Sequence, residues 1–87
     1  MTGEELYRLR KDLGDAIGRD ISFADMARIC GLAPSNGADT IRKWEAGEGP
    51  SGPVAALLEL IWSAYEGDCD PAATEFFDRW IEGRLKV

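Results

Sequence analysis

Apolar residues recur at intervals of three and four along most of the chain, which is the spacing of one face of an α-helix. No segment alternates apolar and polar residues as a half-buried β-strand would. The pattern predicts helices over about residues 3–13, 22–30, 38–46 and 53–65, and a last helix that opens at Asp70-Pro71. The sequence therefore predicts an all-α fold of five helices.

Capping and turn residues mark the boundaries of the first two helices. Gly14 is expected just past the end of the first helix, so that residues 15–21 form a connector, either irregular or with one extra helical turn around Ala16 and Ile17. Ser22, with Asp25 three residues later, resembles a capping box at the start of the second helix. Gly31 supplies a left-handed stop, which makes this second helix short.

The third predicted helix is also short, and it exposes cations. Ser35 or Asn36 is expected to cap its start, and Gly47 to end it. The helical spacing buries Ile41 and Trp44. The positions expected to face solvent are Asp39, Arg42 and Lys43.

The 87-residue length bounds the fold to one domain with a modest core. No stretch is apolar enough to span a membrane, and the first ten residues are too charged for a signal peptide, which predicts a cytoplasmic chain. Cys30 and Cys69 have no neighbouring cysteine, and the chain has no histidine, so we expect reduced thiols and neither a metal nor a cofactor.

The net charge of −6 opposes phosphate binding, but it is unevenly distributed. Residues 1–44 hold seven basic and seven acidic side chains, so this half is neutral. Residues 45–87 hold three basic and nine acidic side chains, which accounts for the whole excess. A nucleic-acid face is therefore expected in the first half.

Two segments resemble the Cro/repressor-like (XRE-type) helix-turn-helix family. They are Ser22–Leu32, with the sequence SFADMARICGL, and Thr40–Gly47, with the sequence TIRKWEAG. The resemblance implies a lambda-repressor-like, five-helix DNA-binding domain in which Ala27 lets two helices cross closely. Residues 1–66 would be the helix-turn-helix unit, and residues 67–87 a C-terminal dimerisation helix of the same domain.

In this family the third helix reads base edges in the major groove. Arg42 or Lys43 would then bond guanine O6 and N7, and Asn36 would pair with adenine. Asp39 would accept from a cytosine amino group, or it would serve as a capping carboxylate in the first turn.

Four further residues are candidates for contacts with phosphates. Thr40 either bonds a phosphate or packs its hydroxyl on its own helix. Ser35 is either an N-cap or a phosphate ligand. Arg19 and Arg28 either bind phosphates or lie as solvated surface charges. The family's usual polar phosphate contact after Ser22 is replaced by Phe23, and the turn before the third helix is about four residues longer than usual.

Family members often link an arginine of the first helix to the glutamate that follows the recognition helix. Arg10 and Glu45 occupy these positions, so the resemblance implies a structural ion pair that fixes the third helix. Trp44, Trp62 and Trp80 lie on or beside apolar stripes, which favours core packing over base stacking.

The last helix carries more apolar residues than one buried face needs. We expect the surplus to form the contact of a homodimer. The residues concerned are Phe76, Phe77, Trp80 and Ile81.

The sequence favours a dimeric repressor that binds an inverted repeat in double-stranded DNA. The alternative is an antitoxin-like or phage-type adaptor whose acidic second half binds a protein partner. An enzyme is disfavoured, because the carboxylates share no obvious cleft and the chain lacks histidine and a phosphate-binding glycine loop.

Overall fold

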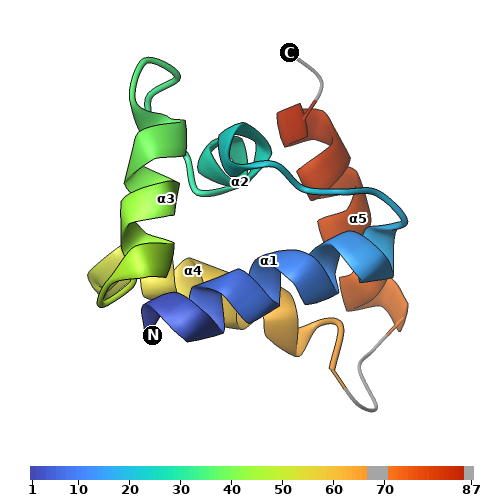
Figure 1. The fold of residues 1–87 in the computed structure, drawn as a ribbon. Helices are drawn as coiled ribbons and strands as arrows, with labels where there is room; N and C mark the ends of the chain where they lie inside the picture. The colour runs from blue at the N-terminus through green and yellow to red at the C-terminus, as the bar shows by residue number, and fades with distance from the viewer. Residues whose placement is uncertain (67–70, 86–87) are drawn as a thin grey trace.

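The computed structural model describes residues 1–66 and 71–85, and in these residues the chain forms five α-helices and no strand. The all-α prediction is thereby confirmed for this part of the chain. In Figure 1, α3 and α5 stand at opposite ends of α1, and α2 lies between them. The helices are α1 (Gly3–Ile17), α2 (Phe23–Ile29), α3 (Gly37–Ala46), α4 (Gly52–Ser63) and α5 (Pro71–Leu85).

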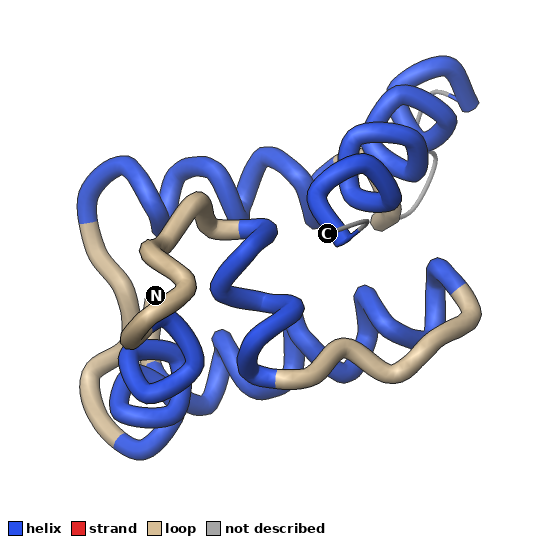
Figure 2. Tube along the Cα trace, turned by 90° about the horizontal axis from the view of Figure 1, so that it is seen from above, coloured by secondary structure: helices blue, strands red, loops and turns tan. Residues whose placement is uncertain are grey.

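One apolar core joins the helices. The loops between successive helices from α1 to α4 are short (Figure 2). Each of the five helices places at least one fully buried aliphatic side chain in this core. Trp44, Trp62 and Trp80 are partly buried and pack against it, as the core-packing interpretation predicts. Fully buried members include Leu6, Leu13, Met26, Ile41, Leu58, Ile61 and Ile81.

The first helix is longer than the sequence pattern predicts. Gly14 lies inside α1, and the helix ends at Ile17, with Gly18 as the left-handed cap at a φ of 76°. A Cβ on Gly14 would lie 2.7 Å from the carbonyl oxygen of Arg19. Gly14 is therefore not a helix stop; it lets the chain after α1 fold back closely over the helix.

The start of α2 agrees with the predicted capping box. The Ser22 hydroxyl accepts from the Asp25 backbone N–H at 3.1 Å, and the Ser22 N–H donates to the Asp25 carboxylate at 3.4 Å. Gly31 has a φ of 76°, the left-handed conformation expected of a stop after this helix.

The last helix begins at Pro71, whereas Asp70 and Cys69 lie outside the described residues. Two side-chain hydrogen bonds hold α5 against the end of α4. The Tyr65 hydroxyl donates to the Asp78 carboxylate at 2.6 Å, and the Thr74 hydroxyl donates to the Ala64 carbonyl oxygen at 2.6 Å. None of the helices in the described ranges has the length and apolar character to cross a membrane.

Candidate nucleic-acid interface

The helices α2 and α3 meet where both carry minimal side chains. Gly37, the first residue of α3, is buried, and a Cβ placed on it would lie 2.7 Å from the Cβ of Ala27. The same Cβ would lie 3.3 Å from the Cβ of Leu32. The two helices can approach this closely only because position 37 has no side chain and position 27 has a methyl group. This contact sets the start of α3 directly against α2.

One face of α3 points away from the protein. Ile41 on the inner face is fully buried, and Trp44 packs against the core. Asp39, Arg42 and Lys43 lie on the outer face and are exposed. Arg42 donates to the Asp39 carboxylate, and both side chains are more than half exposed. The buried and exposed faces of α3 are therefore those that the sequence predicts. The outer face presents a guanidinium, an ammonium and a carboxylate together.

The loop before α3 stays exposed, and neither predicted cap is made by a side chain. Asn36 occupies the N-cap position without a side-chain hydrogen bond to the helix, and Ser35 is not the cap residue. Both residues are solvent-exposed, and Figure 1 shows their loop protruding beyond the start of α3. The Thr40 hydroxyl donates to the Asn36 carbonyl oxygen at 3.0 Å, which is the alternative in which Thr40 packs on its own helix.

The far end of α3 is held by the Arg10–Glu45 ion pair that the resemblance implies. Arg10 Nε donates to Glu45 Oε2 at 2.7 Å, and Arg10 Nη2 donates to Glu45 Oε1 at 3.1 Å. The remaining Nη1 donates to the Ile21 carbonyl oxygen at 2.8 Å. The two side chains are only 10% and 8% exposed. One guanidinium therefore joins α1, the segment that enters α2, and the end of α3.

Phe23, at the position where the resemblance implies a polar phosphate contact, lies against the Arg10 guanidinium instead. The centroid of its ring lies 4.6 Å from the Arg10 Cζ atom, and the centroid of the Tyr7 ring lies 5.7 Å from the same atom. An aromatic face attracts a cation and excludes water from it, which strengthens the hydrogen bonds to Glu45. Phe23 thus shields the ion pair that fixes α3.

Arg19 and Arg28, on opposite sides of Asp25 in the sequence, meet at its carboxylate. Arg28 Nη1 lies 3.1 Å from Asp25 Oδ1, and Arg19 Nη2 lies 3.8 Å from Asp25 Oδ2. Asp25 is 15% exposed, whereas the two arginine side chains are 49% and 40% exposed. The sequence pattern assigns Asp25 to the capping box alone. Its spacing from Arg28 signals one of these contacts, but the contact with Arg19 depends on how the connector folds back.

The predicted dimer residues on α5 have different environments. Ile81 is fully buried in its own chain, so it belongs to the core and offers no surface to a partner. Phe77 and Trp80 are partly buried, and Phe76 is 61% exposed. The helical period explains the difference, because Ile81 lies on the side of α5 opposite to Phe76.

Comparison with known proteins does not assign the chain to a family. Neither protein-family models, nor curated proteins, nor solved structures gave a match to the chain. Within residues 1–66 and 71–85, no group of three side chains suited to metal ligation lies together. The placement of α3 and of the charges around it is therefore the basis on which a function can be proposed.

Proposed function

We propose that this chain is a sequence-specific DNA-binding transcriptional regulator with a lambda-repressor-like arrangement, and that α3 is its recognition helix. The observation that carries the proposal is that α3 is fixed at both ends while its outer face is free. Gly37 contacts Ala27 at the start, and Glu45 is held by Arg10 at the end. A short rigid helix with an exposed guanidinium can enter a major groove about 12 Å wide.

The ion pair between Arg42 and Asp39 does not prevent Arg42 from reading a base. An exposed pair of this kind contributes only about 0–1 kcal/mol. A bidentate contact between arginine and guanine discriminates by about 1–3 kcal/mol. The base contact therefore outweighs the ion pair, so Arg42 exchanges its partner, or keeps one donor on Asp39, when a guanine is present.

Contacts with phosphates would come from the neighbouring elements. Arg19 and Arg28 share the charge of a single carboxylate, so this cluster keeps a net positive charge. Ser35 and Asn36 are exposed at the start of α3, where backbone N–H groups favour an anion. Lys43 is exposed, and no ion pair engages it among the described residues. In this proposal Arg19, Arg28 and Ser35 position α3 on the phosphates, and Arg42, Lys43 and Asn36 read bases.

The mode of action that this arrangement supports best is repression by a homodimer at an inverted repeat. One recognition helix covers only a few base pairs, and two copies related by a twofold axis read two half-sites. The whole excess of acidic charge lies in residues 45–87, and apart from Glu45, which pairs with Arg10, its carboxylates come after α3 in the chain.

The test is selection of bound sequences from a random duplex pool, followed by titration of the selected duplex with variants. Arg42→Ala should weaken binding about 5- to 150-fold, because it removes a contact of about 1–3 kcal/mol. Arg8→Ala is the matched control, since Arg8 is also an exposed arginine paired with a carboxylate on its own helix. Equal affinity of wild type and Arg42→Ala for the selected duplex would refute the assignment of α3.

Phosphate contacts have a separate signature. Arg28→Ala should lower the slope of log affinity against log salt by about 0.9 and weaken binding to all duplexes alike. Arg42→Ala should instead relax the selected sequence at one position. If both variants changed only the salt slope, α3 would bind DNA without reading its sequence.

The second candidate function is a protein-binding adaptor, and a separate surface favours it. Where α1 meets α4, one shallow hollow is lined by four carboxylates and one guanidinium, so its charge is net negative; the residues are Glu5, Asp12, Glu59, Glu66 and Arg8. A basic partner would match this charge. Selection that enriches no duplex, together with a basic protein that co-purifies with the full chain and is released by salt, would favour the adaptor.

A further inference from the structure

A partly enclosed hollow lies where the end of α1 meets α5. Its volume is about 180 Å³. Figure 1 shows the end of α1 beside α5, so two segments far apart in the chain form the walls of the hollow. We call it the α1–α5 hollow, and the residues that line it include Ile17, Arg19, Asp78, Ile81, Glu82 and Leu85.

The bottom of the α1–α5 hollow is apolar. Ile81 is fully buried, and Ile17 and Leu85 are partly buried against the core. Arg19 and Glu82 are exposed, so charged groups lie at the rim and aliphatic groups beneath them. An occupant with an aliphatic body would therefore remove apolar surface of the protein from water, which favours binding.

Charges of opposite sign lie on the two walls. Arg19 follows the end of α1, whereas Asp78 and Glu82 lie one helical turn apart on α5. No ion pair joins Arg19 to either of these carboxylates, although the structure describes all three residues. The hollow thus separates a cation from two anions.

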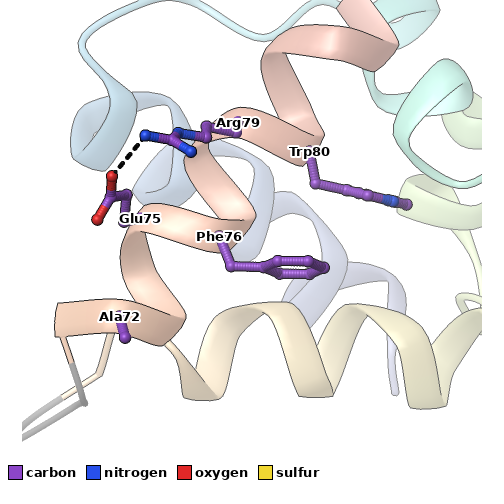
Figure 3. Close-up of a pocket in the computed structure, with 5 residues that line it drawn as sticks. All are labelled: Ala72, Glu75, Phe76, Arg79 and Trp80. Atoms are coloured by element: carbon purple, nitrogen blue, oxygen red, sulfur yellow. Dashed lines mark hydrogen bonds and ion pairs between the residues drawn. The ribbon is translucent and has the colours of Figure 1, made fainter.

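This separation distinguishes the α1–α5 hollow from a larger hollow along the outer side of α5. That hollow has a volume of about 500 Å³ and is lined by one carboxylate and one guanidinium. Figure 3 shows these two groups, Glu75 and Arg79, already joined to each other, at 2.8 Å. They neutralise one another, whereas the charges across the α1–α5 hollow do not.

The Arg19 guanidinium has donors available for a ligand. Its carboxylate neighbour among the described residues is Asp25, at 3.8 Å, which is longer than a hydrogen bond. Asp78, on the opposite wall, is held in place because its carboxylate accepts from the Tyr65 hydroxyl at 2.6 Å. The cation can therefore turn toward an incoming anion, while one carboxylate opposite it is already positioned.

We propose that the α1–α5 hollow binds a small zwitterion with an aliphatic body, a free α-amino acid of the size of valine or leucine. Arg19 donates to the carboxylate of the ligand, Asp78 and Glu82 accept from its ammonium, and its side chain packs on the aliphatic bottom. The volume lies below the about 300–1,000 Å³ that drug-sized ligands occupy, which suits a small molecule.

The charges of the hollow select against simpler ligands. A plain carboxylate would bind Arg19 but would meet the repulsion of two carboxylates on the other wall. A plain amine would bind those carboxylates and leave the guanidinium unmatched. A ligand that carries both charges pairs every group at the rim, so a zwitterion is favoured over either.

Occupancy of the hollow bears on the proposed DNA interface through Arg19. This residue also lies beside Asp25, in the cluster with Arg28 that is proposed to contact phosphates. A guanidinium that binds the ligand is not available to a phosphate, so amino acid and duplex compete. By linkage, each should weaken the binding of the other by the same factor, about fivefold or more. This step rests on the proposed function, whereas binding of the amino acid does not.

Calorimetric titration of the full chain with leucine, without DNA, tests the site. We expect a dissociation constant of about 1 mM or below. Isocaproate lacks only the ammonium of leucine, and isoamylamine lacks only its carboxylate. Glycine keeps both charges but has no aliphatic body. Each of the three should bind at least about tenfold more weakly than leucine.

Variants of the lining residues locate the site. Arg19→Gln and Glu82→Gln should each weaken leucine binding by about tenfold or more, because each removes one charge of the pair. Ala16, which is exposed on α1 and also lines the hollow, offers a variant that changes no charge. Ala16→Leu keeps a good helix former and fills the space, so it should abolish binding.

Two exposed residues of the same helices provide matched controls. Arg8 on α1 and Glu75 on α5 each carry the same charge as the residue they control for, and neither lines the hollow. Arg8→Gln and Glu75→Gln should leave leucine binding unchanged. Circular dichroism should show wild-type helix content in all five variants, because the replaced side chains are exposed.

Three outcomes would overturn the proposal. They are no heat of binding with valine or leucine at about 10 mM, equal binding of isocaproate and leucine, and unchanged leucine binding in Arg19→Gln. The coupling is tested separately by titrating a selected duplex with and without leucine. A chain that binds leucine but selects no duplex refutes DNA binding alone. A duplex affinity that leucine does not change refutes the coupling through Arg19.

Discussion

Replacing Arg10 by alanine tests the ion pair that fixes α3. The substitution removes two hydrogen bonds to Glu45 and one to the Ile21 carbonyl oxygen. It leaves a carboxylate that is 8% exposed without its counter-ion. Breaking a buried pair on one side costs about 3–5 kcal/mol, because the remaining charge stays desolvated.

This cost is large compared with the total stability. An 87-residue domain is expected to unfold at a cost of about 4–13 kcal/mol. For a domain of this size, each kcal/mol shifts the thermal midpoint by about 4–8 °C. A loss of about 3 kcal/mol therefore lowers the midpoint by about 12–24 °C. We expect Arg10→Ala to be partly unfolded near physiological temperature.

Circular dichroism during thermal and urea denaturation measures the effect, and a double-mutant cycle assigns it. Arg10→Met with Glu45→Leu replaces both charges by apolar groups, so the double variant should recover part of the stability lost by Arg10→Met alone. An unchanged denaturation midpoint in Arg10→Ala would refute the reasoning. So would full additivity of the two single changes, because coupled partners cannot be additive.

Two other changes test packing and titration. Gly3→Ala would place a Cβ 2.4–2.7 Å from three backbone oxygens at the end of α3, so we expect a loss of about 1–3 kcal/mol by urea denaturation. Gly83→Ala, which meets no atom within 4 Å, is its control and should not destabilise the monomer. Burial raises the pKa of the Cys30 thiol from 9.0 to about 12. Above pH 9 the unfolded chain therefore loses this proton first, and stability should fall as the pH rises toward 12. The fall should be shallower in Cys30→Ala by at most about 1.4 kcal/mol per pH unit, and parallel pH profiles would contradict burial of the thiol.

The local sequence determined the helices and most of their ends. The capping box at Ser22 and the stop at Gly31 depend on residues a few positions apart, and both occur as predicted. The two faces of α3 follow from helical spacing alone, since Ile41 is buried and Arg42 is exposed. Short-range chemistry was sufficient for these features, because the groups that interact lie within one turn of each other.

Some of the sequence predictions were incomplete because a glycine has more than one use. The pattern predicts Gly14 as a helix stop, whereas this residue allows the Arg19 carbonyl oxygen to pack on α1, and Gly18 ends the helix.

The prediction for α5 was incomplete for a different reason. Ile81 follows the apolar pattern of α5 but lies in the core, while Phe76 on the opposite side is exposed. The number of apolar residues in a helix does not indicate which of its sides the rest of the chain will cover.

Contacts between distant residues depended on the tertiary structure. The junction of Arg19 and Arg28 on Asp25 arises because the connector returns to the start of α2. The Phe23 ring meets the Arg10 guanidinium because α2 packs against α1, whereas Tyr7 lies one turn from Arg10 on α1 itself. A hydrophobic pattern indicates which side of a helix is buried, but not which neighbour buries it. Only the packing of the helices decides that, because partners far apart in the chain are chosen by shape and charge together.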